Sequence, residues 1–479
     1  MAVAHGAGKH LAEREAPLPA LTAGPWGARL GVVSVVACLG GLLFGYDTGV
    51  VNGSLRPMSE ELGLDALGQG VATSSLVFAA AIGALLGGRL SDRHGRRTVL
   101  VALAVLFFVG AVVLVAAPGL GVLVVGRVLL GLAVGGASTV VPVYLAELAP
   151  HEIRGSISGR NEVAIVVGQL AAFVVNAILG VTLGHLDGVW RIMVAVCALP
   201  AVALFVGMLR MPESPRWLVA RGRRDDALAV LRQVRPAERA AAELARIERS
   251  VAAADDRGRA RLRLVDVLAD RPLRRILVAG IGVAVAQQLT GINAIMYYGQ
   301  SVLVESGFSE QAALIANVAP GVIAVVGGLV ALAMMDRVDR RTTLILGFSL
   351  TTACHVLIGI ASSVLAVGDP ARPFVILALV VLFVGAMQTF LNVATWVYLS
   401  EVFPLRMRGL GIGVAVLLHW LVNGSLALAF PSLLAAVGMS GTFWLFACVG
   451  AVALAFIVRR VPETRGRTLE GLEAELTAR

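Results

Sequence analysis

The chain has 479 residues, of which 58% are hydrophobic and 15% charged, and its formal net charge is +9. A soluble domain of this size does not need so much apolar sequence, and most of it falls in runs of about 20 residues, the length that crosses a bilayer as a helix. The arginines behind the positive charge gather in alternate loops, so we attribute them to membrane orientation and exclude nucleic acid as a partner.

The order of apolar and polar segments predicts an all-α membrane protein in two halves. A polar tail is expected at 1–28, a six-helix half at 29–210, a cytoplasmic helical linker at 211–273, a second six-helix half at 274–459 and a tail at 460–479. The twelve transmembrane helices are expected near 29–51, 70–90, 98–117, 120–146, 158–182, 190–210, 274–300, 311–335, 342–366, 373–400, 408–434 and 440–459. The lipid bilayer is therefore the expected environment.

Three short patterns occur once in each half with the same internal order, which indicates that the halves are homologous. The first pattern is Tyr144, Glu147, Pro150, Arg154 and Gly155, repeated as Tyr398, Glu401, Pro404, Arg408 and Gly409. The second is Asp92-Arg93-His94-Gly95-Arg96-Arg97, repeated as Asp336-Arg337-Val338-Asp339-Arg340-Arg341. The third is Pro212-Glu213-Ser214, repeated as Pro462-Glu463-Thr464. Tandem membrane halves of this kind are typical of secondary transporters.

The distribution of arginine between loops predicts the orientation of the chain. The arginine-rich segments are 89–97, 154–160, 210–275, 337–341, 406–408 and the tail after 459. The intervening loops hold few arginines and several acids. Because basic loops stay on the cytoplasmic side, both termini are expected in the cytoplasm of a multi-pass protein of the cell membrane.

The linker has the sequence signals of short helices. Ser214 is a plausible N-cap, and Pro215 suits the first helical position. Charged and apolar residues then alternate at helical spacing over 225–231 and 237–251. A disordered basic tether is the alternative interpretation of this segment.

Asp47 is the residue with the highest energetic cost at its predicted place, because it lies inside the first span. A carboxylate at membrane depth costs roughly 3 kcal/mol or more, and such residues commonly mark a proton or ion path. Arg127, near the start of the fourth span, is its candidate partner at a similar depth. We predict that the two couple proton movement to transport; a static buried ion pair is the alternative.

Charged residues form two predicted clusters at the cytoplasmic ends of the spans. The first comprises Arg89, Asp92, Arg93, Arg97, Glu147 and Arg154, and the second Asp336, Arg337, Arg341, Glu401 and Arg408. Ion pairs between helix ends can latch one half against the other and break when the halves move. The alternative is that these charges are solvated and only set the topology.

Polar and aromatic residues within the spans are the candidates for substrate binding. They are Phe44, Gln169, Gln287, Gln288, Asn293, Trp396, His419, Trp420 and Asn423. Neutral amides donate and accept hydrogen bonds without a charge penalty, and indole rings offer a flat apolar surface, so together they suit a polyhydroxylated ring. Hydrogen bonds between helices are the alternative role for any one amide.

No motif points to catalysis. The chain has no nucleophile–base arrangement, metal-ligand cluster or phosphate loop that fits its context. We therefore expect no enzyme activity, cofactor or metal. His355, on the ninth span, has no charged neighbour in sequence and is expected to be a packing residue.

These motifs resemble, over about 29–470, the sugar porter branch of the major facilitator superfamily. The resemblance is carried by Phe44-Gly45-Tyr46-Asp47, by Gly88 to Arg97, by Gly126-Arg127, by the two Glu…Pro…Arg-Gly repeats, by Pro212 to Arg216, by Gln287 to Asn293 and by Pro462 to Gly466. It implies the major facilitator fold, a central cavity and alternating access. It also implies hexose or pentose transport, with sugar contacts from Gln169, Gln287, Gln288, Asn293 and Trp396. Relatives that import protons carry Asp at the position of Asp47, and Arg127 matches its partner.

Several positions depart from the family pattern. Asn392-Val393 replaces a Gly-Pro pair, His419 stands where relatives often have Gln, and Glu162 stands where they often have Gln. Ala324 replaces an Asn, and Asp339 replaces the Gly of the second loop motif. The class is unaffected, whereas the particular sugar stays open.

The sequence therefore predicts a monomeric transporter that imports a monosaccharide by proton symport. A facilitator of a sugar or of a polyol such as inositol, without coupling, is the nearest alternative. A membrane sugar sensor that binds without transport is a third.

Overall fold

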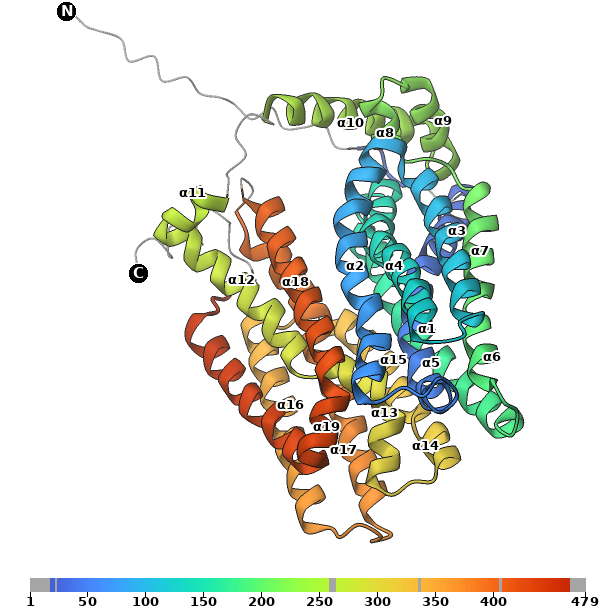
Figure 1. Ribbon diagram of the computed structural model, residues 1–479. Coiled ribbons are helices and arrows are strands. Elements are labelled where there is room, and N and C mark those ends of the chain that lie inside the picture. Colours follow the sequence, from blue (N-terminus) through green and yellow to red (C-terminus); the bar gives the residue numbers. More distant parts are fainter. Residues whose placement is uncertain (1–17, 22–23, 258–263, 335–336, 405–406, 466–479) are drawn as a thin grey trace, which may run out of the picture.

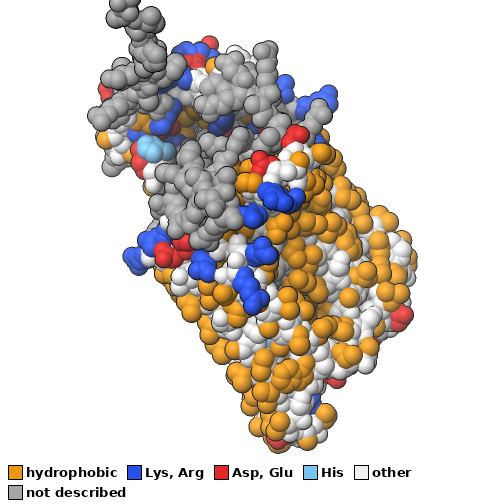
Figure 2. Space-filling model, turned by 90° about the vertical axis from the view of Figure 1, so that its left-hand side faces the viewer, with side chains coloured by type: hydrophobic (Ala, Val, Ile, Leu, Met, Phe, Trp, Pro, Cys, Tyr) orange, Lys and Arg blue, Asp and Glu red, His pale blue; other side chains and the backbone are white. Residues whose placement is uncertain are grey.

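The computed structural model describes residues 18–21, 24–257, 264–334, 337–404 and 407–465, and the side chains of 154–156, 158 and 253–257 lie outside this description. Throughout these ranges the regular elements are helices, arranged as two bundles side by side (Figure 1). The apolar faces of the helices pack against one another, and the remaining apolar side chains point outward. Figure 2 shows these hydrophobic side chains over the lateral surface, with Lys and Arg gathered toward one end.

The first bundle contains the first seven helices. They are α1 (Pro25–Leu62), α2 (Ala66–His94), α3 (Arg96–Val115), α4 (Leu120–Leu148), α5 (Arg154–Leu183), α6 (Val189–Ala195) and α7 (Ala198–Leu209). α6 and α7 follow each other in one apolar stretch, so the bundle has six spans. α4 packs between α2 and α3, and α1 packs along α5.

Short helices between the bundles lie at one end of the molecule. They are α8 (Pro215–Ala220), α9 (Arg224–Val234), α10 (Ala237–Arg257) and α11 (Leu264–Ala269). The Ser214 hydroxyl accepts a hydrogen bond from Trp217 N, so the predicted N-cap and the Pro215 start are confirmed. We call this end, at the top of Figure 1, the linker face and the other end the opposite face.

The second bundle contains the remaining helices. They are α12 (Arg271–Leu289), α13 (Ile292–Ser306), α14 (Glu310–Ala316), α15 (Val318–Met334), α16 (Arg340–Val364), α17 (Arg372–Ala386), η2 (Met387–Asn392), α18 (Val393–Val402) and α19 (Arg408–Arg460). In the described ranges, eleven helical stretches are long and apolar enough to span a membrane.

The longest of these stretches accounts for two spans. α19 has 53 residues, which would reach roughly 80 Å if straight, more than twice the hydrocarbon thickness of a bilayer. The chain reverses at Gly438, whose φ of 68° is in the left-handed region that glycine adopts without strain. The predicted fold of twelve membrane-spanning helices in two six-helix halves is thus confirmed.

Three local features differ from the predicted spans. The predicted 274–300 span is broken between α12 and α13, where Gly291 has φ 76°. The first helix runs past 51 to Leu62 because polar residues continue it beyond the apolar run, and Gly63 caps it. At Asn392-Val393 the tenth span passes through the π-helical turn η2 rather than a break.

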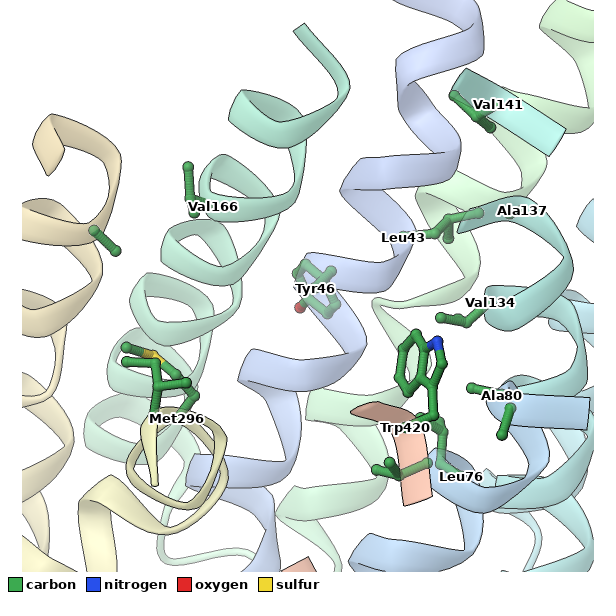
Figure 3. Close-up of a cluster of buried hydrophobic side chains, with 14 of the residues drawn as sticks. Leu43, Tyr46, Leu76, Ala80, Val134, Ala137, Val141, Val166, Met296 and Trp420 are labelled. Atoms are coloured by element: carbon green, nitrogen blue, oxygen red, sulfur yellow. The ribbon is translucent and has the colours of Figure 1, made fainter. Parts of the chain in front are cut away.

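The two halves contact each other mainly through α19 against α2, α15 against α5 and α13 against α1. Figure 3 shows Trp420 of α19 beside Leu76 and Val134 of the first half, and Tyr46 of α1 facing α5. These contacts enclose a cavity between the halves, and polar side chains of both halves line it.

Candidate functional site

A cavity of about 410 Å³ lies between the halves and receives side chains from both. The nine residues predicted to bind substrate all line it: Phe44, Gln169, Gln287, Gln288, Asn293, Trp396, His419, Trp420 and Asn423. The lining extends toward the linker face through Pro142 on α4 and Val416 on α19. The structure thus brings these side chains together, while their role in binding stays a prediction.

Four further residues with amide or carboxylate side chains line the same cavity and were absent from the predicted binding set. They are Asn161 and Glu162 on α5, and Gln388 and Asn392 on η2. A detectable signal existed in each case, because amides and a carboxylate inside an apolar run are uncommon. Glu162 is the acidic side chain of this lining.

A chain of hydrogen bonds crosses the second-half wall of the cavity. Asn293 Nδ2 donates to Gln288 Oε1 at 2.9 Å, and Gln288 Nε2 lies 2.6 Å from His419 Nε2. Because the Gln288 amide nitrogen can only donate, His419 Nε2 accepts, and its Nδ1–H donates to the Ala284 carbonyl at 3.2 Å. This network fixes the orientation of the Gln288 amide at the cavity.

Other amide oxygens at the cavity have no partner among the described residues. These buried acceptors are Asn161 Oδ1, Gln287 Oε1, Gln388 Oε1 and Asn423 Oδ1. A buried polar atom without a hydrogen bond costs about 1–3 kcal/mol. Their gathering in one cavity suits a ligand that carries several hydroxyl donors.

Aromatic rings form an apolar wall beside these amides. Phe44 of the first half and Trp420 of the second have ring centroids 5.7 Å apart. The rings of Trp396 and His419 are 5.2 Å apart. A wall of this kind next to amides can hold the C–H face of a ring while its hydroxyls are hydrogen-bonded.

The predicted partners Asp47 and Arg127 form a buried ion pair next to the cavity. Arg127 Nη1 lies 3.0 Å from Asp47 Oδ1, and both side chains are at most 4% exposed. Arg127 Nε also donates to the Ala72 carbonyl at 3.0 Å, whereas Asp47 Oδ2 has no partner within the described part of the chain. Phe44 and Thr48, on the same helix as Asp47, line the cavity. α1 therefore carries one partner of the ion pair and part of the cavity wall.

The charge cluster of the first half is centred on Glu147. Its carboxylate binds Arg96 Nε at 2.9 Å and accepts the hydroxyl of Ser214. Glu213 accepts the backbone N–H groups of Arg96 and Arg97 at 2.8 and 3.1 Å. The cluster joins the start of α3 and the end of α4 to the start of α8.

The second half repeats this arrangement around Glu401. Its carboxylate binds Arg340 Nη2 at 3.0 Å and accepts the Thr464 hydroxyl at 2.7 Å. Glu463 accepts the backbone N–H groups of Arg340 and Arg341 at 3.0 and 2.9 Å. Arg96 and Arg340 were absent from the predicted set, although they hold equivalent places in the repeated motif.

The other predicted cluster residues have varied positions. Arg97 and Arg341 donate to the carbonyls of Met208 and Val458, at 3.0 and 2.7 Å. Arg408 Nε donates to the Phe403 carbonyl at 3.2 Å. Asp92 binds Arg96 at 2.9 Å, and Arg89, Arg93 and Arg337 have exposed side chains. Asp336 and the side chain of Arg154 lie outside the described residues.

These two clusters each join residues of one half, and the contacts between halves lie at the opposite face. There, Asn52 Nδ2 donates to the Met296 carbonyl at 2.7 Å, and Gln300 N donates to Asn52 Oδ1 at 2.8 Å. Arg56 also binds Glu310 of the second half at 2.7 Å. The predicted latch between the halves stays a prediction for a conformation in which the linker face is closed. Asn52 directly follows the predicted first span, and a polar residue at that place is the sequence signal for this contact.

The linker is fixed to the corner between α4 and α5 by two arginines. Arg239 binds Glu152 at 2.8 Å and Glu243 at 2.6 Å, and Arg235 binds Glu243 at 2.9 Å and the Leu148 carbonyl at 2.8 Å. Burial lowers the pKa of Arg235, against the raising effect of Glu243. Burial acts to raise the pKa of Glu152, but hydrogen bonds from its own backbone and from Arg239 leave that pKa below its ordinary value. This corner directly follows Glu147, so the linker reaches the first cluster.

Comparisons with known proteins agree with this geometry. A family model described as "Sugar (and other) transporter" matches residues 33–476. The chain is 49% identical to the major myo-inositol transporter IolT of Bacillus subtilis over 94% of each chain. It is 31% identical to the arabinose-proton symporter of the same organism, over 93% of this chain and 95% of that one. It is similar to the inward open conformation of the xylose transporter XylE from E. coli, with a TM-score of 0.81 and 30% identity, over 93% of this chain and 99% of that one.

Proposed function

Because the chain belongs to the sugar (and other) transporter family, we propose that it imports a polyhydroxylated ring, a monosaccharide or a cyclic polyol, together with a proton. The observation that carries this proposal is the cavity between the halves, where unpartnered amide oxygens lie beside an aromatic wall. Ring hydroxyls would donate to Gln287, Gln388 and Asn423, and the ring face would lie against Trp396 or Trp420.

The identities of the relatives favour one substrate to test first. This chain shares 49% of its residues with a myo-inositol transporter and 31% with an arabinose-proton symporter. A cyclic polyol such as myo-inositol and a pyranose both present a six-membered ring with mainly equatorial hydroxyl groups. We therefore expect myo-inositol to compete with monosaccharides for the same amides.

Coupling to protons is assigned to Asp47 and Arg127. A proton on Asp47 would cancel the charge that Arg127 Nη1 faces at 3.0 Å and so weaken the pair. α1 would then be able to move, and Phe44 and Thr48, which line the cavity, would move with it. A membrane potential of about 100 mV contributes about 2.3 kcal/mol per proton, which is roughly 50-fold accumulation. An arabinose-proton symporter among the relatives supports this mechanism.

We infer that the linker face is cytoplasmic and that both ends of the chain lie on that side. The arginine-rich loops and the linker helices are at this face, as the positive-inside rule requires. The contacts of Asn52 and Arg56 close the opposite face, so the conformation is inward-facing. The TM-score of 0.81 with an inward open transporter supports this inference. Transport would then alternate between this state and one closed at the linker face.

The test is uptake of radiolabelled myo-inositol, D-glucose, D-xylose and L-arabinose into proteoliposomes, with and without an inward proton gradient. We expect accumulation of at least one substrate, abolished by a protonophore. A Gln287→Ala variant should lose uptake, because it removes a cavity amide. Uptake that only equilibrates would identify a facilitator, in which Asp47 and Arg127 form a static pair. Binding without uptake would favour a sensor.

A further inference from the structure

The polar residues of the second half lie on both sides of a break in one membrane span. α12 ends at Leu289, Gly291 has the left-handed φ of 76°, and α13 begins at Ile292. Gln287 and Gln288 precede the break, Asn293 follows it, and all three line the cavity. The geometry of the break therefore sets where these amides stand relative to one another.

His355 contacts the break from a neighbouring helix. It lies on α16, is 1% exposed, and its Nε2 is 2.9 Å from the Thr290 carbonyl oxygen. A carbonyl can only accept, so His355 Nε2 carries the hydrogen and donates it. The carbonyl groups at the end of a helix have no partner within that helix. His355 supplies one of these missing partners from outside.

Aromatic rings hold His355 in this place. The ring centroid of Phe383 lies 4.6 Å from that of His355, and those of Phe446 and Phe443 lie 5.5 and 5.7 Å away. Phe446 also contacts the break directly, because a Cβ added to Gly291 would lie 2.8 Å from Phe446 Cζ. His355 and Phe446 thus enclose the two residues, Thr290 and Gly291, at which the helix is interrupted.

Packing alone does not account for a histidine at this position. Its Nδ1 is buried and has no hydrogen-bond partner in the described ranges. A phenylalanine would fill the same aromatic pocket without leaving a bare nitrogen. Unpartnered buried polar atoms are uncommon and need a reason. The bond from Nε2 to the break supplies that reason.

We propose that His355 is a positioning residue for the cavity: its bond to the Thr290 carbonyl holds the break between α12 and α13, and so keeps Gln287 and Gln288 in register with Asn293. The proposal rests on the proposed function in taking this cavity as the substrate site. The sequence predicted only a packing role for His355, because its contact with the break joins two distant spans.

Three variants of the full-length protein in nanodiscs test this inference. His355→Phe keeps the ring and removes the donor, and His355→Gln keeps a donor. Thr351→Val is the matched control, because it removes a buried hydroxyl from the same helix that bonds only within that helix, to the Gly347 and Phe348 carbonyls. The first measurement is hydrogen–deuterium exchange of the backbone amides at 290–295 without ligand. The second is the Kd of radiolabelled myo-inositol.

We expect His355→Phe to speed exchange at 290–295 by about 10-fold, the factor that corresponds to loss of one hydrogen bond. The Kd should rise by a similar factor, and His355→Gln should restore both values to within about 3-fold of wild type. Exchange in His355→Phe equal to that in Thr351→Val would overturn the proposal. Faster exchange in both variants would also overturn it, since general loosening of α16 would then explain the result. If the wild-type protein neither binds nor transports any tested ring compound, the proposed function is rejected. The exchange measurement then tests only whether His355 holds the break.

Discussion

The charge cluster of the first half and that of the second share one bonding pattern and differ in how much water reaches them. In each, a glutamate at the end of a span binds an arginine and a hydroxyl. The side chain of Glu147 is 11% exposed, whereas that of Glu401 is 30% exposed. Tyr144, one turn before Glu147, donates to the Pro212 carbonyl at 2.7 Å, but Tyr398 has no partner within the described ranges.

A segment outside the repeated motifs adds to the burial of the first cluster. α8 and the residue after it cover the first cluster: Trp217 Nε1 donates to the Asp92 carbonyl at 2.9 Å, and Arg221 donates to the Arg93 carbonyl at 2.7 Å. The repeat therefore sets the bonding pattern, and in the first half the linker adds to the burial of the cluster. We infer that the first half is the more rigid body at the linker face.

The halves also divide their functional groups. The buried Asp47–Arg127 pair belongs to the first half, whereas the broken span and most of the cavity amides belong to the second. This division predicts that coupling can be lost while the cavity stays intact. Asp47→Asn should abolish gradient-driven accumulation and leave exchange of labelled substrate across the membrane, because the amide cannot take up a proton.

Uptake and counterflow in proteoliposomes measure this largest effect. Glu305→Gln, which neutralises an exposed acid of the second half, is the control and should accumulate substrate as the wild type does. Uphill uptake retained by Asp47→Asn would remove the coupling role of the first half. Loss of exchange as well would show that the pair shapes the cavity itself.

The different burial of the clusters predicts unequal losses of stability. Arg96→Ala leaves the largely buried Glu147 carboxylate without its arginine. The free energy of unfolding should therefore fall by about 2–4 kcal/mol. Arg340→Ala should lower the free energy of unfolding by about half as much, because Glu401 is more exposed to water than Glu147, while a hydroxyl donor remains on the glutamate in both variants. Thermal unfolding of both variants in one detergent gives the order. Equal losses would contradict the inference that the linker makes the first half more rigid.

Contacts between the halves should affect conformation more than contacts within one half. Asn52→Ala removes the bonds to α13 at the opposite face and should shift the balance toward outward-facing states by about 10-fold. Asn176→Ala is the matched control, since Asn176 bonds the Gly49 and Val50 carbonyls of the same helix from within the first half. Distances between spin labels at the opposite face report the shift. A similar shift in both variants would show that α1 is loosened generally.

Much of this architecture was predictable because membrane spans are long and the halves repeat. Apolar runs gave the twelve helices, and intramembrane amides such as Gln287 marked the cavity. The break at Gly291 was not predicted, because a glycine inside an apolar run is compatible with a continuous helix. Arg96 was missed because its motif has three arginines, and spacing alone does not say which side chain turns toward Glu147. Asn52 was missed because its partners lie in the other half.

The smallest expected effect comes from removing one tyrosine hydroxyl group at each cluster and comparing the loss of stability. Tyr144→Phe removes the donor to the Pro212 carbonyl and leaves that carbonyl without this partner, so it should cost about 1–2 kcal/mol. Tyr398→Phe removes a buried hydroxyl that has no partner in the described part of the chain, so stability should stay within about 0.5 kcal/mol of wild type or rise slightly. Thermal unfolding of both variants under identical conditions measures the difference. The two substitutions delete the same atom at equivalent places of the repeat, so each is the control for the other. A loss in Tyr398→Phe as large as that in Tyr144→Phe would mean that the second cluster is closed as tightly as the first, and that the linker is not what distinguishes them.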